Sequence, residues 1–190
     1  MRIAYVKSGD VVAALEQLEA GGLDDDGGPD GFLADLLRSL AGDELLLLGV
    51  GAGVTQTRAA ASTRLGLQIT ARALPAARRR ARLRAAWRIA VQLCRHRPAV
   101  VICGKCGFPL WASALVARLR GARLIHSRHN WHERSARGGW LARQLDAWLV
   151  RRADGVLCHG PYLRDRLLAS GVPAARLQVF DSGNRTLVAR

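Results

Sequence analysis

Residues 99–130, AVVICGKCGFPLWASALVARLRGARLIHSRHN, contain two short apolar runs separated by an amphipathic segment. The pattern predicts a strand at 99–102, a helix at 108–120 and a second strand at 123–127. A strand, a helix and a strand in about 30 residues form one βαβ unit, and such crossovers join parallel strands with a right-handed turn. Ligands bind at the carboxyl ends of strands in open parallel sheets, so the loops at 103–107 and 128–133 are the first candidates for a binding site.

The same alternation continues over the whole chain of 190 residues. Further strands are predicted at 3–6, 45–50, 67–70, 155–158 and 177–180, and further helices at 11–20, 31–41, 76–96, 139–152 and 162–170. Residues 54–66 are predicted to form a polar loop or an irregular helix. This alternation predicts one α/β domain over residues 1–190, with a doubly wound, Rossmann-like parallel sheet in three layers, α/β/α.

The chain is strongly basic, because 29 lysine and arginine residues against 15 acidic residues give a net charge of +14. Such a charge attracts phosphate-bearing ligands, an anionic membrane surface or nucleic acid. An arginine-rich composition with solvated faces explains the same count. Nucleic acid is an unlikely partner, because the arginines are not interleaved with aromatic residues.

The cysteine and hydropathy patterns favour the cytoplasm. Four cysteines, only two of them close together, do not form a disulfide framework, which indicates a reducing compartment. The apolar run at residues 3–6 is too short for a signal peptide. No stretch approaches the roughly 20 apolar residues of a transmembrane helix, so any membrane contact is expected to be peripheral, on the inner face.

The helix predicted at 76–96, opened by Pro75, carries a dense group of arginines. With Leu83 at the centre of the apolar face of a helical wheel, Trp87, Ala90 and Cys94 fall on the same face. Two interpretations are open for the polar side. It is either the solvated face of a core-packed helix or a surface for an anionic membrane or another polyanion, formed by Arg78, Arg82, Arg84 and Arg88.

Cysteine and histidine residues follow the two central strands. Cys103 and Cys106 form a C-x-x-C element in a strand-to-helix turn, where Lys105 and helix N–H groups favour a thiolate. A zinc site would need further ligands, such as His126, His129 and His132. The alternative is that Cys103 packs at the sheet edge and Cys106 is incidental, and we predict no metal. Because alternate strand residues point to opposite faces, only His129 and, farther along the loop, His132 are expected to reach the cleft.

Six strings occur in a characteristic order. They are GGPDGFLADLL at 27–37, PAVVI at 98–102, ARLIHSRHN at 122–130, ADGVLC at 153–158, LLASGVP at 167–173 and RLQVF at 176–180. In this order they resemble the amino-terminal domain of a GT-B-fold glycosyltransferase of the glycosyltransferase family 4 type. The resemblance covers nearly all of the chain.

The resemblance implies that a sugar is transferred from a nucleotide-sugar donor to an acceptor, and that this domain forms the acceptor side of a cleft. It implies that Gly27 and Gly28 let the backbone approach a substrate. His129 matches the family's cleft histidine, a catalytic residue that orients the transferred sugar or polarises a hydroxyl. Further candidate substrate-binding residues are Arg128, Asn130 and Lys105.

The family's carboxy-terminal, donor-binding domain is absent from the chain, so the chain alone is expected to be inactive. The nucleotide-sugar is then a donor substrate, and no tightly bound cofactor is expected. Neither a Gly-x-Ser-x-Gly elbow nor a Walker loop occurs, which removes the main support for a hydrolase or a nucleoside triphosphatase. The alternative, from another functional class, is a non-catalytic Rossmann-like module that binds polyanions or an anionic membrane surface.

Overall fold

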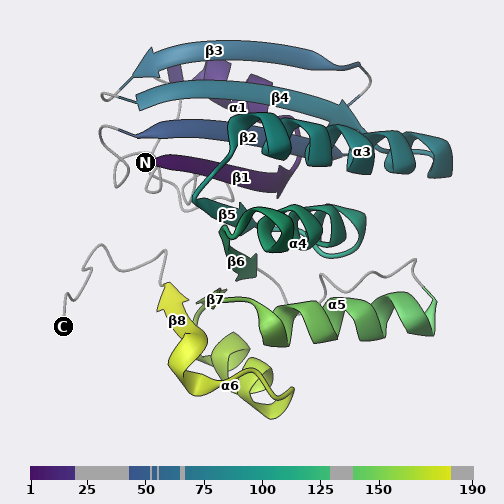
Figure 1. The fold of residues 1–190 in the computed structure, drawn as a ribbon, viewed down its shortest axis with the longest axis vertical. Coiled ribbons are helices and arrows are strands. Elements are labelled where there is room, and N and C mark those ends of the chain that lie inside the picture. The colour runs from purple at the N-terminus through teal and green to yellow at the C-terminus, as the bar shows by residue number, and fades with distance from the viewer. Residues whose placement is uncertain (20–42, 52, 55, 65–66, 129–138, 181–190) are drawn as a thin grey trace.

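A computed structural model describes residues 1–19, 43–51, 53–54, 56–64, 67–128 and 139–180. These residues form one sheet of eight strands in the order β3-β4-β2-β1-β5-β6-β7-β8 (Figure 1). The strands are β1 (Arg2–Ser8), β2 (Glu44–Gly51), β3 (Arg58–Arg64), β4 (Leu67–Pro75), β5 (Val100–Cys103), β6 (Arg123–Arg128), β7 (Gly155–His159) and β8 (Leu177–Phe180). Neighbouring strands are parallel except for β3 and β4, which are antiparallel.

The described helices cover both faces of this sheet. They are α1 (Val11–Glu19), α3 (Arg79–His96), α4 (Phe108–Arg120), α5 (Trp140–Arg152) and α6 (Pro161–Ala169), with a short 3-10 helix, η1 (Ala174–Arg176). One apolar cluster packs α1 against β1, β2 and β4, and the other packs α3, α4, α5 and α6 against the opposite face. The predicted three-layer, doubly wound, Rossmann-like fold is therefore confirmed. The helix predicted at 31–41 lies outside the described residues.

Strand β1 is the centre of the sheet and the place where the direction of winding reverses. From β1 the chain proceeds through β2 and β4 on one side, and it then returns to β5 on the other side and continues through β6, β7 and β8. Residues from Ile3 to Val6 are buried on both faces, as expected for a central parallel strand. In open α/β sheets such a reversal is the point at which ligands bind, outside the carboxyl ends of the strands.

The buried face of α3 differs from the one that the helical wheel predicted. Ile89 is fully buried, together with Ala85 and Leu93, whereas Leu83 is 66% exposed and Trp87 is 71% exposed. The prediction was wrong because the helix carries two apolar stripes, and the bulkier one was taken as the core face. The stripe with the smaller residues packs on the sheet and against α4.

Two boundaries also differ from the prediction. Residues 58–64 are not a loop or an irregular helix but the strand β3, which pairs with β4 at the edge of the sheet. Its alanine, serine and threonine residues show no apolar alternation, because an edge strand is held mainly by its backbone. Pro75 ends β4 opposite Gly51 rather than opening the helix, and α3 begins four residues later, at Arg79.

We predict that Ile89→Ala lowers the free energy of unfolding by about 2–4 kcal/mol, because it leaves a cavity between α3 and the sheet. Leu83→Ala is the matched control, and its effect is expected within about 0.5 kcal/mol because the side chain is exposed. Urea denaturation of the two variants and the parent measures the difference. A larger loss for Leu83→Ala than for Ile89→Ala would contradict this packing.

Candidate functional site

Hydrogen bonds between loops tie together the carboxyl ends of β1, β2 and β5. The Gly104 N–H donates to the Val6 carbonyl at 2.8 Å, and the Gly9 N–H donates to the Val50 carbonyl at 3.2 Å. The Lys105 ammonium also donates to the Val50 carbonyl, at 3.1 Å. Because β1 lies between β2 and β5, this lysine connects two strands across the point of reversal.

Glycine is required where the loop after β1 meets β2. A Cβ atom on Gly49 would lie 2.5 Å from the Gly9 carbonyl oxygen and 2.8 Å from the Val11 nitrogen. Gly9 itself has a φ of +97°, a conformation that residues with a side chain rarely adopt. The turn from β1 into α1 therefore lies directly against the end of β2.

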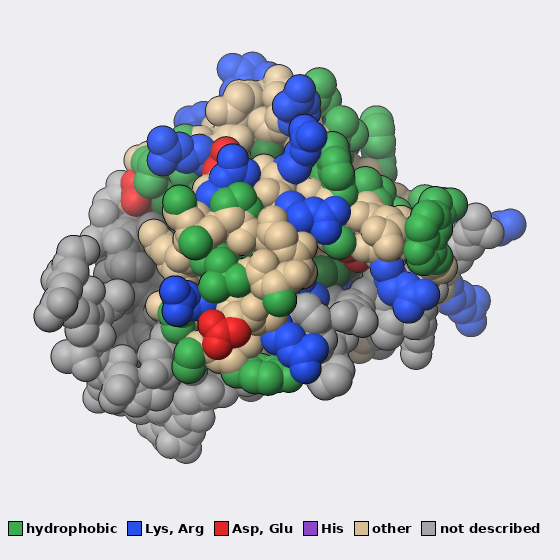
Figure 2. Space-filling model, turned by 90° about the horizontal axis from the view of Figure 1, so that it is seen from below, with side chains coloured by type: hydrophobic (Ala, Val, Ile, Leu, Met, Phe, Trp, Pro, Cys, Tyr) green, Lys and Arg blue, Asp and Glu red, His purple; other side chains and the backbone are tan. Residues whose placement is uncertain are grey.

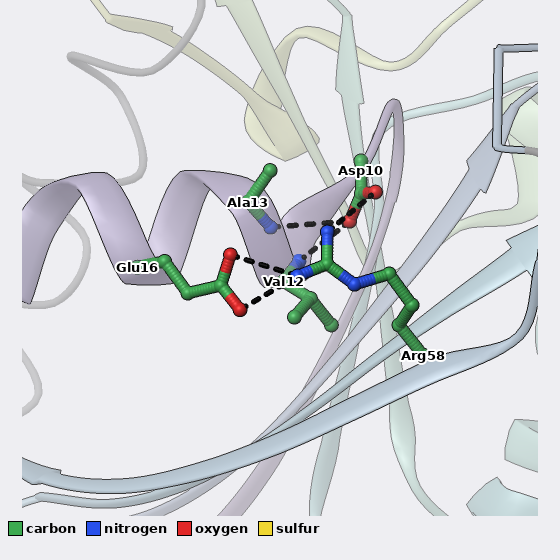
Figure 3. A network of polar contacts seen from close by, with 5 residues as sticks. All are labelled: Asp10, Val12, Ala13, Glu16 and Arg58. Carbon is green, nitrogen blue, oxygen red and sulfur yellow. Dashed lines mark hydrogen bonds and ion pairs between the residues drawn. The ribbon is translucent and has the colours of Figure 1, made fainter.

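A second group of contacts fixes the start of α1 at the same edge. The Asp10 carboxylate accepts hydrogen bonds from the Val12 and Ala13 N–H groups at 3.0 and 3.1 Å, which caps the helix. Arg58 of β3 lies 3.6 Å from Asp10 and donates to Glu16 at 2.7 Å (Figure 3). Because two carboxylates neutralise Arg58, its role is to hold the β3–β4 hairpin against α1.

The buried carboxylate of Asp146 joins α5 to the start of α4. Its Oδ1 accepts hydrogen bonds from the Gly107 N–H at 3.0 Å and from the Trp111 indole N–H at 2.6 Å. Burial raises the pKa of Asp146, while the two hydrogen bonds and the charge of Arg128 act in the opposite direction. Asp146 thus holds the start of α4, and it lies close enough to Arg128, the last residue of β6, for that charge to act on its carboxylate.

The cysteine and histidine side chains that the structure describes do not converge on a metal geometry. Cys103 is buried and its thiol donates to the Lys105 carbonyl at 3.3 Å, as expected for a cysteine packed at the sheet edge. The Cys106 sulfur lies 3.9 Å from Nε2 of the buried His126. Over the described residues, no three histidine, cysteine, aspartate or glutamate side chains form a group suited to a metal ion.

The structure places six of the residues singled out from the sequence. Lys105 and Arg128 lie at the carboxyl edge of the sheet, after β5 and at the end of β6. Arg78, Arg84 and Arg88 line a cleft at the end of β4, whereas Arg82 donates to the Ala76 carbonyl at 3.4 Å. Gly27, Gly28, His129 and Asn130 lie outside the described residues, as does His132.

Sequence reasoning missed Asp146 and Arg80. Asp146 is the only acidic residue between 140 and 152, in a helix that is otherwise apolar and basic, and that isolation was a usable signal. Arg80 lines the same cleft as Arg78, Arg84 and Arg88. On a helical wheel centred on Leu83, Arg80 lies about 60° from the centre of the apolar face, and this position hid its role.

The model of the glycosyl transferase 4-like domain matches residues 27–183 of the chain. The chain belongs to this family. No curated protein matches it in sequence. The predicted resemblance is therefore confirmed at the level of the family, by a match that includes β5 and β6.

Solved structures show the same fold for this glycosyl transferase 4-like domain. One is the UDP-GlcNAc 2-epimerase from Neisseria meningitidis bound to UDP-GlcNAc, with 10% sequence identity and a TM-score of 0.56. Another is a putative UDP-N-acetylglucosamine 2-epimerase from Listeria monocytogenes, with 14% sequence identity and a TM-score of 0.55. A third is MurG from Acinetobacter baumannii (15%, 0.50). The alignments cover 94%, 93% and 97% of this chain but only 45%, 44% and 47% of those chains. The domain thus corresponds to slightly less than half of each of these GT-B-fold proteins.

In the part of the chain that the structure describes, no helix combines the length and the apolar character needed to cross a membrane.

We predict that Asp146→Ala lowers the free energy of unfolding by about 2–4 kcal/mol, because it leaves two buried donors without an acceptor. Asp146→Asn keeps an acceptor oxygen and removes the buried charge, so its loss is expected to be smaller. Chemical denaturation compares the two variants at neutral pH, and equal losses would contradict a role that depends on the accepting oxygen.

The same carboxylate has a pH signature. Because the pKa of Asp146 is raised in the folded state, the unfolded chain releases this proton at lower pH than the folded chain. The free energy of unfolding therefore falls as the pH rises from the ordinary aspartate pKa towards the raised value. Asp146→Asn should reduce this fall, whereas the exposed Asp165→Asn should leave it unchanged.

Proposed function

We propose that this domain is the acceptor-binding half of a glycosyltransferase that transfers a sugar from a nucleotide-sugar to an acceptor hydroxyl. The family match over residues 27–183 carries the proposal. The reversal of the sheet at β1 supports it, because that reversal places Lys105 at the edge where α/β proteins bind ligands.

His129 is the proposed catalytic residue. It follows Arg128 directly, and Arg128 ends β6 at the carboxyl edge of the sheet. At this position a histidine orients the transferred sugar or polarises a hydroxyl group. Arg128, Asn130 and Lys105 donate hydrogen bonds to the acceptor substrate, and Gly27 and Gly28 let the backbone approach that substrate. Catalysis by such a site is mainly positioning and electrostatic stabilisation of the departing phosphate.

Asp146 and Arg128 support this arrangement as positioning residues. The Asp146 carboxylate holds the start of α4 through Gly107 and lies within electrostatic reach of Arg128. It therefore couples the loop that carries Lys105 to the strand that leads into His129. A change at Asp146 is expected to move both loops relative to each other.

The donor is proposed to bind mainly to a second domain. The Neisseria epimerase is described with bound UDP-GlcNAc, and the present chain spans 45% of that protein. A cleft formed by two such halves would place the donor opposite the carboxyl edge of this sheet. The cytoplasm, where nucleotide-sugars are available to such an enzyme, is the proposed location.

Calorimetric titration of the chain with UDP-GlcNAc, and a transfer assay with a panel of nucleotide-sugars, test this division of the site. We expect binding weaker than about 1 mM and no turnover for residues 1–190 alone. In a two-domain form of the protein, transfer should appear, and His129→Ala should reduce kcat while Arg95→Gln, at the far end of α3, leaves it unchanged. Turnover by residues 1–190 alone would overturn the proposal.

A second proposed function is peripheral attachment to an anionic bilayer through the layer formed by α3, α4 and α5. Exposed apolar side chains occur on all three helices, which lie side by side in Figure 1: Leu83, Trp87, Leu115, Leu119, Trp140, Leu141, Leu145 and Trp148. The last turns of α4 and α5 are basic, with Arg118, Arg120, Arg151 and Arg152. At the α6 end of the molecule, which Figure 2 shows, Lys and Arg side chains are likewise scattered among hydrophobic ones, with few acidic side chains. Apolar anchors mixed with arginines complement anionic lipid.

Vesicle flotation tests this attachment. Leu115→Asp combined with Leu119→Asp should weaken binding to phosphatidylglycerol vesicles by about tenfold or more, because each buried leucine contributes about 1.5–3 kcal/mol. Tyr162→Asp on α6 is the control for an added negative charge on an exposed residue away from these helices. Equal loss in both variants, or none in either, would contradict docking through this layer.

A further inference from the structure

A cleft of about 530 Å³ lies where β4 ends and α3 begins. Four arginines of α3 and its amino-terminal cap line it, Arg78, Arg80, Arg84 and Arg88, and Thr57 and Gln56 face them from the segment before β3. The apolar residues Leu74, Pro75 and Ala85 complete the lining. The guanidinium-bearing residues are exposed at its mouth, so a dissolved ligand can reach them.

No carboxylate of the described residues compensates the positive charge of this cleft. Among the described residues, no carboxylate forms an ion pair with any of the four arginines, whereas Arg2 and Arg58 do have acidic partners. The sequence explains this difference, because no aspartate or glutamate occurs between Glu44 and Glu133. Arginine guanidinium groups bind phosphate oxygens through paired hydrogen bonds.

Two of the four arginines, the amino-terminal cap Arg78 and the first-turn residue Arg80, stand where they disfavour their own helix. The first turn of α3 contains no acidic residue and no side chain caps it, and cations at the positive end of a helix are destabilising by a few tenths of a kcal/mol or more each. By contrast, Arg95 at the other end of α3 is placed favourably. A bound anion would reverse this unfavourable placement, which is the usual reason for such a violation at a functional site.

One of the four arginines is already oriented. Arg88 donates from Nη1 to the Thr57 hydroxyl, which holds its guanidinium against the segment that leads into β3. Arg58, the residue directly after Thr57, is directed away to Asp10 and Glu16 and does not take part. The cleft is therefore built from two segments that are far apart in the sequence.

The position of the cleft relates it to the proposed site. Leu74 and Pro75 end β4, which is parallel to β2 and, through β2 and β1, to β5 and β6. The cleft thus opens at the same carboxyl edge as Lys105 and Arg128. Four strand spacings separate β4 from β6 in the order of the sheet, which is about 19 Å.

We propose that this arginine cleft binds a phosphate or diphosphate group of the acceptor, at a distance from the hydroxyl that reacts. The inference rests on the proposed function and narrows its acceptor class to phosphate-bearing molecules long enough to reach from β4 to β6. Binding of a remote, non-reacting group contributes free energy that positions the reacting hydroxyl. Soluble sugar phosphates and lipid-linked sugar diphosphates share this chemistry.

The test measures binding of phosphate probes to the 190-residue chain at one fixed salt concentration. Arg80→Gln combined with Arg84→Gln should weaken the affinity for inorganic diphosphate by about tenfold or more, because charged hydrogen bonds contribute about 1.5–3 kcal/mol each. Arg95→Gln combined with Arg123→Gln removes the same charge outside the cleft and should change the affinity by about twofold at most. Both pairs of residues are exposed, so the variants should fold, and their melting temperatures verify this.

Two arms identify the source of the phosphate. In one arm the probes are inorganic diphosphate and a sugar 1-phosphate in solution, and in the other an isoprenyl diphosphate is embedded in neutral phosphatidylcholine vesicles. A lipid-linked acceptor is supported if binding is tighter in the vesicle arm and is lost when Arg80 and Arg84 are changed. A soluble acceptor is supported if binding is tighter in solution and is lost in the same variant. Equal losses in the cleft and control variants would overturn the proposal, as would no diphosphate binding at all.

This experiment needs neither a donor nor turnover, so its failure is separate from that of the proposed function. If the cleft variant binds diphosphate normally while the two-domain protein transfers sugar, only the inference about the acceptor is overturned. If the cleft binds diphosphate as predicted while the two-domain protein transfers no sugar, the proposed function is overturned.

Discussion

The parallel pairing of β1 with both β2 and β5 is the constraint on which the rest of this domain depends. It places the carboxyl ends of three strands side by side, and the hydrogen bonds of Gly104, Gly9 and Lys105 then connect the loops that leave them. Parallel strands require crossover connections, and from β4 to β8 each return passes through a helix and delivers the next loop to the same edge. Lys105, Arg128 and the arginine cleft share one edge for this reason.

The basic residues of the domain fall into two groups, those with a carboxylate partner and those with none among the described residues. Arg2 pairs with Glu44 at the amino ends of β1 and β2, and Arg58 pairs with Asp10 and Glu16 and holds the β3–β4 hairpin in place. The arginines at the start of α3 meet none among the described residues, and they line a cleft. The basic residues behind the net charge of +14 therefore have different effects. A cation with an acidic partner contributes to the structure, whereas a cation with none among the described residues remains available to an anionic ligand.

The buried Asp146 shows that a residue outside the proposed catalytic and binding groups can shape the candidate site. It contacts no proposed substrate group, yet it accepts hydrogen bonds from the start of α4 and lies near Arg128. A buried carboxylate is costly unless it is hydrogen-bonded, and the Gly107 and Trp111 donors meet that requirement for Oδ1, whereas Oδ2 has no hydrogen-bond partner among the described residues. Its value to the domain is that it joins α5 to the start of α4, beside the loop after β5.

Sequence alone determined the class of the fold, its central βαβ unit and the family. These follow from local patterns: apolar runs of strand length, helical periodicity between them, and motifs in a characteristic order. It did not determine which stripe of α3 faces the core, because Leu83 and Trp87 form as apolar a stripe as Ala85, Ile89 and Leu93. Nor did it reveal β3, whose residues carry no alternation because its pairing is made by the backbone. The tertiary structure decided both, and it brought Thr57 to Arg88 and Asp146 to Gly107, because contacts between residues far apart in sequence depend on the order of the strands and leave no periodicity in the chain.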